Sequence, residues 1–193
     1  MSTPDTGPST VKAAHRAEAR ARRRSSPPAD ANALASRALS LVESLPGPRR
    51  VTCYASYGTE PPTAALCRAL ADAGFEVLLP RVRDDRLEWV VSGGATSTSA
   101  MGIEEPTGPA VPLSPVRAML IPALAVSIRG DRLGKGGGFY DRALSGLGEE
   151  GPVIAAIVDD GDVVDEVPTE EHDCRVDVIV TPSRIIDCAG NSR

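Results

Sequence analysis

A chain of 193 residues, of which 41% are hydrophobic and 24% charged, has the composition of a single soluble globular domain with a substantial core. It contains neither an apolar run long enough to span a membrane nor the apolar segment of a signal peptide, so we expect a cytoplasmic protein without a membrane partner. The four cysteines form no C-x-x-C pair and there are two histidines, which argues against a structural zinc site.

The N-terminal region combines a polar tail with a basic segment. Residues 1–10 are rich in Ser, Thr, Pro and Gly, which predicts a disordered tail. The alanines and arginines of residues 11–24 favour a helix, in which Lys12 and Arg16 project from one face because they are spaced i, i+4. The excess of basic side chains is compatible with a nucleic-acid arm. No aromatic stacking residue accompanies them, so a solvated helix face is favoured.

A ligand-binding loop is predicted after the first strand. The apolar stripe that begins at Leu34 and recurs at i+4, i+7 and i+11 predicts a second helix, and residues 50–55 follow as a strand. In open α/β sheets, ligands bind at loops that follow strands. Thr59 is placed to cap the next helix and Pro61 to begin it, so Glu60 either complements that helix N-terminus or contacts a ligand.

The segment of residues 132–142 carries the strongest functional pattern. An apolar run of strand length, residues 119–126, precedes it, and residues 139–147 can continue as a helix. A glycine-rich turn between a strand and a helix lets backbone N–H groups approach a phosphate. The spacing matches neither a P-loop nor a dinucleotide fingerprint, and a bare glycine cluster can be a simple flexible turn. Two cations and an acid favour the phosphate site, namely Arg132, Lys135 and Asp141.

Residues 121–125 (IPALA) and 130–142 (GDRLGKGGGFYDR) resemble the signature of the 5-formyltetrahydrofolate cyclo-ligases, also called methenyltetrahydrofolate synthetases. The similarity extends over about residues 11–182. Lys12-Ala-Ala-His-Arg16 resembles the family's Lys-x-x-x-Arg pair, which contacts ATP. Glu60-Pro-Pro-Thr63 resembles its Glu-x-x-Thr loop, whose glutamate contacts the folate.

The order of the elements indicates the fold class. Strands interleaved with helices predict an α/β fold with a largely parallel sheet, in which residues 153–158 read as a buried strand. The resemblance implies a three-layer sandwich around that sheet, as in the sugar-phosphate isomerase and CoA-transferase superfamily. It also implies a single domain of residues 11–187 followed by a short tail of residues 188–193. We expect a monomer.

The resemblance implies ATP-dependent conversion of 5-formyltetrahydrofolate into 5,10-methenyltetrahydrofolate, with Mg²⁺ as cofactor and release of ADP and phosphate. Phosphoryl transfer to the formyl oxygen needs positioning and charge neutralisation more than a protein nucleophile. The implied catalytic residues are Arg132, Lys135 and Tyr140. The implied ATP-binding residues are Lys12, Arg16, Arg132, Leu133, Gly134, Lys135, Gly136, Gly137, Gly138, Phe139 and Tyr140. The implied folate contacts are Ala55, Glu60, Trp89 and Tyr140, and the implied magnesium ligands are Asp141 and Asp173.

Several alternatives stay open at this point. Pro62 stands where many relatives carry an acid, and Ser127 where many have an aspartate, so a non-catalytic paralogue that binds nucleotide or folate is the main rival. Trp89 suits a core as well as a ligand platform. Asp141 also suits the first turn of a helix, where an acid is favoured. A nucleic-acid-binding adaptor that uses the basic helix is a more distant alternative, and we expect no nucleic-acid partner.

Overall fold

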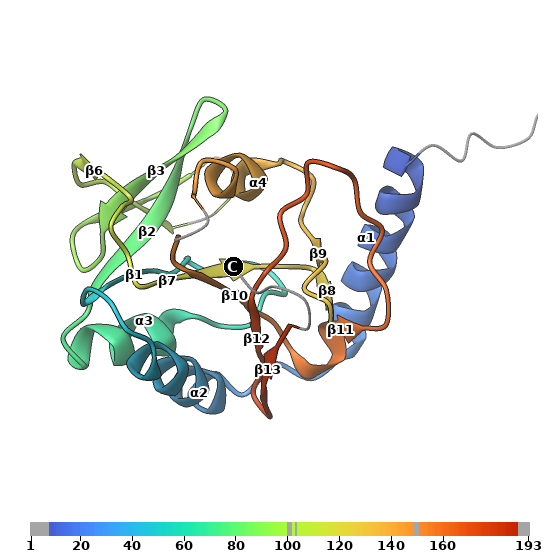
Figure 1. Cartoon of the computed structure of the whole chain (residues 1–193), viewed down its shortest axis with the longest axis horizontal. Coiled ribbons are helices and arrows are strands. Elements are labelled where there is room, and N and C mark those ends of the chain that lie inside the picture. Colours follow the sequence, from blue (N-terminus) through green and yellow to red (C-terminus); the bar gives the residue numbers. More distant parts are fainter. Residues whose placement is uncertain (1–7, 100–101, 103, 149–150, 189–193) are drawn as a thin grey trace, which may run out of the picture.

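The computed structural model describes residues 8–188 except 100–101, 103 and 149–150 (Figure 1). Its centre is an eight-stranded sheet in which the strands from β12 to β2 are parallel, while β13, β3 and β6 pair antiparallel at the two edges. The predicted largely parallel sheet is therefore confirmed. In spatial order the strands are β13 (Ile185–Asp187), β12 (Val178–Val180), β10 (Val153–Ile157), β7 (Ala118–Pro122), β1 (Arg50–Thr52), β2 (Glu76–Arg83), β3 (Arg86–Val91) and β6 (Ala110–Val111).

Helices cover both faces of this sheet, with α2 (Ala31–Ser44) and α3 (Ala64–Asp72) on one side and α4 (Phe139–Leu144) on the other (Figure 1). Strand β7 shows why two cores form. Successive side chains of a strand point to opposite faces. Ala118 and Leu120 accordingly pack in the cluster that contains α2 and α3, whereas Met119 and Ile121 pack in the cluster that contains α4. The mixed α/β class with helices on both sides of the sheet is confirmed.

Helix α1 (Pro8–Ser25) lies apart from these layers, along a small sheet of β11 (Val163–Val164), β8 (Ala125–Ser127) and β9 (Arg132–Leu133) (Figure 1). It packs through Ala19 onto a third apolar cluster, which includes Leu124 and Val167. The helix begins at Pro8, earlier than predicted, because proline is well suited to a first helical position. Among the described residues, no helix combines the length and apolar character required to cross a membrane.

The apolar run of residues 119–126 is not one strand. It divides between β7 in the main sheet and β8 in the small sheet, and Ala123 and Leu124 connect the two. The remaining elements are a two-stranded sheet of β4 (Thr96–Thr98) and β5 (Glu104–Pro106), a 3-10 helix η1 (Asp160–Asp162), and the connecting loops. Residues 1–7 and 189–193 of the two expected tails lie outside the described residues, whereas Cys188 is buried.

The predicted start of the third helix was wrong. The helix begins at Ala64 after Thr63, not at Thr59 and Pro61. The hydroxyl of Thr63 donates to the carbonyl oxygen of Tyr54 at 2.5 Å and accepts the N–H of Ser56 at 3.1 Å. These bonds tie both ends of the loop together, so that the loop is longer than local sequence preferences indicated.

Candidate active site

A cavity of about 800 Å³ opens beside the carboxyl ends of β1 and β7, with Ala55 and Pro122 on its wall. From β1 the chain proceeds to β2 and β3 on one side, and from β7 it proceeds to β10 and β12 on the other. The neighbouring strands β1 and β7 therefore mark the topological switch point, where open α/β sheets bind ligands. Basic side chains of α1 contribute a further wall of the cavity.

All but one of the site residues expected from the sequence line this cavity. They come from α1, from the loop after β1, from the segment that runs from β9 into the first turn of α4, and from the turn before β12. The cavity-lining members are Lys12, Arg16, Ala55, Glu60, Arg132, Leu133, Gly134, Lys135, Gly136, Gly137, Gly138, Phe139, Tyr140, Asp141 and Asp173.

Trp89 is the exception. It is 5% exposed and belongs to the same buried cluster as Leu78 and Val116, and it is absent from the cavity wall. Leu87, two residues earlier on β3, lines the cavity instead. Because alternate residues of a strand share a face, hydrophobic pattern alone could not decide which of the two contacts a ligand.

The glycine loop connects β9 to α4. Gly136 and Gly138 have φ angles of 107° and 65°, in the left-handed region that side chains other than glycine rarely adopt. With no side chains at residues 136–138, backbone N–H groups can approach an anion closely. The loop is held from α1, because Nε of Arg16 donates to the carbonyl oxygen of Gly134 at 3.0 Å.

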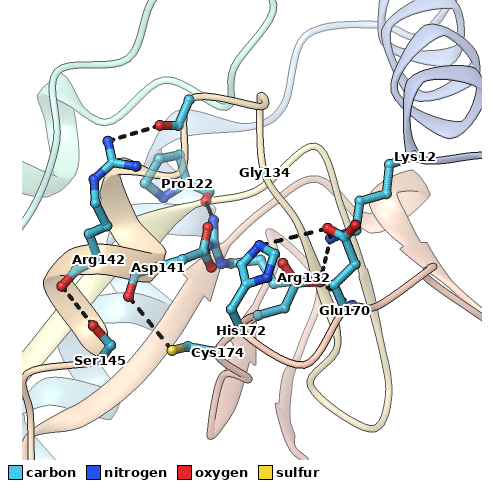
Figure 2. Close-up of polar contacts among 12 residues, drawn as sticks. Lys12, Pro122, Arg132, Gly134, Asp141, Arg142, Ser145, Glu170, His172 and Cys174 are labelled. Atoms are coloured by element: carbon cyan, nitrogen blue, oxygen red, sulfur yellow. Dashed lines mark hydrogen bonds and ion pairs between the residues drawn. The ribbon is translucent and has the colours of Figure 1, made fainter. Parts of the chain in front are cut away.

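Lys12 lies one helical turn before Arg16 on α1, and its side chain is buried (Figure 2). Its ammonium lies 2.5 Å from the carboxylate of Glu170 and 2.6 Å from that of Asp173. Burial lowers the pKa of Lys12, but the hydrogen bonds and charges of Asp173 and Glu170 outweigh it and raise the pKa above its ordinary value. Burial raises the pKa of Asp173, and the hydrogen bond from Lys12 brings it below the ordinary value. Lys12 therefore stays protonated at neutral pH, as the counter-ion of two carboxylates on the cavity wall.

Lys135 links the glycine loop to the loop after β1. Its ammonium is 2.6 Å from the carboxylate of Glu60, whose side chain is 4% exposed, and 3.4 Å from the centre of the Tyr57 ring. The N–H of Tyr57 also donates to Glu60 at 2.9 Å. The alternative in which Glu60 only complements a helix N-terminus is excluded by the later start of α3. Tyr57 was not among the residues predicted from the sequence, although an aromatic residue in a loop that follows a strand of the sheet was a usable signal.

Arg132 stands behind the loop, with a side chain that is 3% exposed. It donates to the carboxylate of Asp141 at 2.5 Å and to the carbonyl oxygen of Pro122 at 3.5 Å (Figure 2). Its buried Nε has no hydrogen-bond partner within the described part of the chain. A buried donor without a partner is costly, so this N–H fits an anion supplied by a ligand.

Tyr140 completes the wall next to Glu60 and Arg132. Burial and the negative charge of Glu60 raise the pKa of the Tyr140 phenol well above its ordinary value, and the charge of Arg132 only partly opposes them. The phenol is therefore neutral at physiological pH. In that state it can donate a hydrogen bond to a reacting oxygen, and it cannot act as a ready base.

The carboxylates of this site are of the kind that magnesium prefers. Asp141 and Asp173 both lie on the cavity wall. Asp173 also forms a cluster with Glu170 and His172, in which the potential ligand atoms lie within 4.8 Å of one another. In this structure Asp141 pairs with Arg132, and Lys12 offers one positive charge to the two carboxylates of Asp173 and Glu170. One carboxylate charge is left unbalanced, so this set of oxygen ligands can hold a further cation. Glu170 was missed in the sequence, where it stands three residues before Asp173.

Ser127, one of the two departures from the family pattern, is fully buried. Its hydroxyl accepts the N–H groups of Arg129 and Asp131, each at 3.2 Å, and donates to the carboxylate of Asp131 at 3.0 Å. It thus fixes the turn that leads into β9 and Arg132. A short side chain with an acceptor oxygen meets this need, so the departure leaves the turn intact.

A cavity at the switch point of an α/β sheet, walled by a glycine loop and by basic side chains, defines an α/β enzyme whose substrate carries phosphate. The chain belongs to the 5-formyltetrahydrofolate cyclo-ligase family, whose family model matches residues 8–182. The family expected from the signature around the glycine loop is confirmed.

Individual relatives agree with this family. The chain is 38% identical over 146 residues to the 5-formyltetrahydrofolate cyclo-ligase of Mycolicibacterium smegmatis, which covers 70% of this chain and 75% of that protein. Its fold matches the 5,10-methenyltetrahydrofolate synthetase of Aquifex aeolicus with a TM-score of 0.76, at 25% identity and 93% coverage of each chain. A 5,10-methenyltetrahydrofolate synthetase from Mycoplasma pneumoniae shares the fold with a TM-score of 0.69 at 17% identity, over 88% of this chain and 97% of that one. The non-catalytic alternative gains no support.

Proposed function

We propose that this protein uses ATP to convert 5-formyltetrahydrofolate into 5,10-methenyltetrahydrofolate, with release of ADP and phosphate. The observation that carries the proposal is the meeting of two loops at one cavity. The glycine loop suits a phosphate, the loop after β1 resembles the family's folate loop, and the ion pair of Lys135 with Glu60 joins them at 2.6 Å. Phosphate and folate bound to these loops would therefore be neighbours.

The nucleotide phosphates would lie against the glycine loop. Arg16 supplies positive charge beside it, and the unpartnered Nε of Arg132 supplies a further donor. Lys12 and Lys135 are paired with carboxylates, and a phosphate would compete with those carboxylates for their charge. Phosphoryl transfer depends mainly on such positioning and charge neutralisation. Asp141 and Asp173 would hold Mg²⁺, which when bound offsets negative charge on the phosphates.

The folate would occupy the side of the cavity that contains Glu60. Glu60 can accept hydrogen bonds from N–H groups of the pterin, and Ala55 leaves room beside it. Apolar side chains of the same wall suit the flat ring system, namely Pro80, Val82, Leu87 and Phe139.

The chemistry follows from the poor leaving-group quality of a formyl oxygen. Transfer of the γ-phosphoryl group to this oxygen releases ADP and converts the oxygen into part of a phosphate, which is a good leaving group. The neighbouring folate N–H nitrogen then attacks the formyl carbon, the bond from this carbon to the phosphate oxygen breaks, the nitrogen's proton leaves with the phosphate, and the ring closes. In this proposal the neutral Tyr140 donates a hydrogen bond near the reacting oxygen, while Arg132 and Lys135 stabilise charge on the transferred group.

A turnover assay tests the proposal directly. Purified protein is mixed with 5-formyltetrahydrofolate, ATP and Mg²⁺, and the rise in methenyl absorbance is followed together with ADP. We expect both products in equal amounts and no methenyl product when ATP is omitted. Binding of folate and ATP without any product would overturn the proposal and restore the non-catalytic alternative.

A further inference from the structure

A buried carboxylate behind the active site has no part in the proposed reaction. Asp131 is 3% exposed and does not line the large cavity. One of its oxygens accepts the Nε–H of Arg175 at 2.7 Å. The other accepts the hydroxyl of Ser127 at 3.0 Å and lies 3.5 Å from Nε of Arg129. A buried charge is costly unless it is paired and hydrogen-bonded, and Asp131 meets both conditions through segments far apart in the sequence.

Arg175 belongs to an acidic turn, residues 169–176, which carries carboxylates of the active site. Asp173 stands two residues before Arg175, and Glu170 stands three residues before Asp173. The N–H of Glu170 donates to the Asp173 carboxylate at 2.7 Å, so the two acidic residues are held as one unit. The ion pair of Arg175 with Asp131 fastens this unit to the residue that precedes β9.

Polar contacts, more than close packing, fix the acidic turn against the start of β9. A separate hollow of about 180 Å³ shares part of its wall with the large cavity, and this hollow is bordered by Asp131, Arg132 and residues 169–170 and 173–175. Beyond it, the N–H of Val176 donates to the carbonyl oxygen of Gly130 at 2.9 Å. Because the hollow leaves the turn without dense packing on this side, its position depends on the ion pair.

We propose that Asp131 and Arg175 are positioning residues, which hold the acidic turn so that the Glu170 and Asp173 carboxylates stay on the cavity wall, ready for a metal ion that accompanies the nucleotide. This inference rests on the proposed function, in which Asp173 is a magnesium ligand. Asp131 directly precedes Arg132, the residue proposed to stabilise charge on the transferred phosphoryl group. The ion pair therefore relates the acidic turn to the site of phosphoryl transfer from behind.

Removal of Arg175 distinguishes positioning from simple electrostatics by the sign of the effect. The guanidinium is a positive charge two residues from Asp173, so if charge alone mattered, its loss would strengthen the binding of a cation there. If Arg175 positions the turn, its loss weakens that binding, because the carboxylates are no longer held in place. Groups that orient metal ligands typically change metal affinity by about tenfold to a hundredfold.

The test compares Arg175→Gln with the matched control Arg129→Gln. Both arginines pair with Asp131, and their side chains are 53% and 52% exposed, but Arg129 lies between β8 and β9 and outside the acidic turn. The dissociation constant of a non-hydrolysable ATP analogue is measured without metal and with Mg²⁺ in excess, beside a thermal melt. We expect Arg175→Gln to reduce the gain in affinity from Mg²⁺ about tenfold or more, with metal-free binding at the wild-type level. Arg129→Gln should leave both values unchanged.

A double-mutant comparison tests the route through the ion pair. Asp131→Asn should reduce the gain from Mg²⁺ as Arg175→Gln does. The double variant should lose no more than Asp131→Asn alone, because both changes break the same pair. Additive losses would overturn the inference.

The remaining outcomes are equally decisive. The inference is overturned by a larger or unchanged gain from Mg²⁺ in Arg175→Gln, by the same loss in Arg129→Gln, or by a wild type in which Mg²⁺ gives no gain. Equal losses with and without metal, together with a lower melting temperature, would reduce the pair to a stabilising role and overturn it too. The proposed function is judged separately: if wild type forms no methenyl product but shows the expected dependence on Mg²⁺ and Arg175, the function fails and the positioning role stands.

Discussion

The ammonium of Lys135 lies 2.6 Å from the carboxylate of Glu60, which joins the glycine loop to a loop far away in the sequence. The pair is shielded, since the Glu60 side chain is 4% exposed and the Tyr57 ring lies 3.4 Å from the ammonium. A phosphate that reaches Lys135 competes with Glu60 for its charge. A folate that reaches Glu60 relieves that competition. The two substrates should therefore influence each other's binding, and by linkage they do so equally.

Glu60→Gln tests both halves of this relationship. The substitution keeps the shape of the side chain but removes the charge that faces Lys135 and the folate. We expect KM for 5-formyltetrahydrofolate to rise about tenfold or more, because a hydrogen bond to a charged group is worth about 1.5–3 kcal/mol. Binding of a non-hydrolysable ATP analogue should be unchanged or tighter. Equal losses for both ligands, together with a lower melting temperature, would instead indicate a structural role.

Arg16 tests the contribution of α1 to nucleotide binding. Arg16→Gln removes the guanidinium that donates to Gly134 and faces the glycine loop. We expect KM for ATP to rise about tenfold with little change in KM for the folate. Arg68→Gln, which removes an exposed arginine of α3 that does not line the cavity, is the matched control. Lys12 is less suitable for this test, because its removal leaves two part-buried carboxylates beside each other without their cation and so lowers stability as well. Unchanged ATP kinetics in Arg16→Gln would assign that residue to packing.

The variant Asp141→Asn tests whether Asp141 is a metal ligand or only a charge at the start of α4. If Asp141 only complements the first turn of α4 and pairs with the buried Arg132, Asp141→Asn would lower the melting temperature and leave the magnesium response unchanged. As a metal ligand, its loss should abolish turnover or shift the magnesium requirement far upward while the fold persists. We expect the second result. The measurement is a magnesium titration of the rate beside a thermal melt, with the exposed Asp85→Asn as control.

We expect Asp160 to contribute to the loss of folding stability in acid. Burial raises the pKa of Asp160, but hydrogen bonds from Ser183 and Thr181 outweigh it and lower the pKa below its ordinary value. A carboxyl group whose pKa is lowered by folding stabilises the folded state at every pH above its unfolded-state pKa, which is about 4. This stabilisation is lost as the pH falls through the lower, folded-state pKa. Asp160→Asn should therefore lower the unfolding free energy at neutral pH by about 1 kcal/mol. The difference in unfolding free energy between Asp160→Asn and wild type should vanish once Asp160 is protonated in acid. Denaturant unfolding at neutral pH and below the folded-state pKa of Asp160 measures this difference. The same difference at both pH values would contradict the role given to the Asp160 carboxylate.

The sequence predicted the features that local chemistry determines. The stripe from Leu34 predicted a helix, the glycines at 134 and 136–138 predicted a turn before a helix, and the i, i+4 spacing placed Lys12 and Arg16 on one face. What it could not predict depends on distant partners. A continuous apolar run does not reveal that β7 and β8 belong to different sheets. The true start of α3 depends on bonds between Thr63 and Tyr54, which only the folded chain brings together.

The same limit explains the misplaced and missed site residues. Leu87 and Trp89 are two residues apart on β3 and so share one face of the strand. Only the packing of the whole sheet decides that Leu87 lines the cavity while Trp89 lies in the core. Glu170 stood in an acidic turn with nothing local to distinguish it. Its importance comes from Lys12, which lies at the opposite end of the sequence.

The burial of Trp89 has a practical consequence for spectroscopy. It is the single tryptophan of the chain, it is 5% exposed, and it lies in the core and not on the cavity wall. Its fluorescence should therefore respond to loss of the packed sheet, when water reaches the indole, and very little to direct contact with a ligand. Unfolding can then be followed through this emission with ATP or folate present. The resulting shifts in the transition midpoint would report the affinity of each ligand for the folded state.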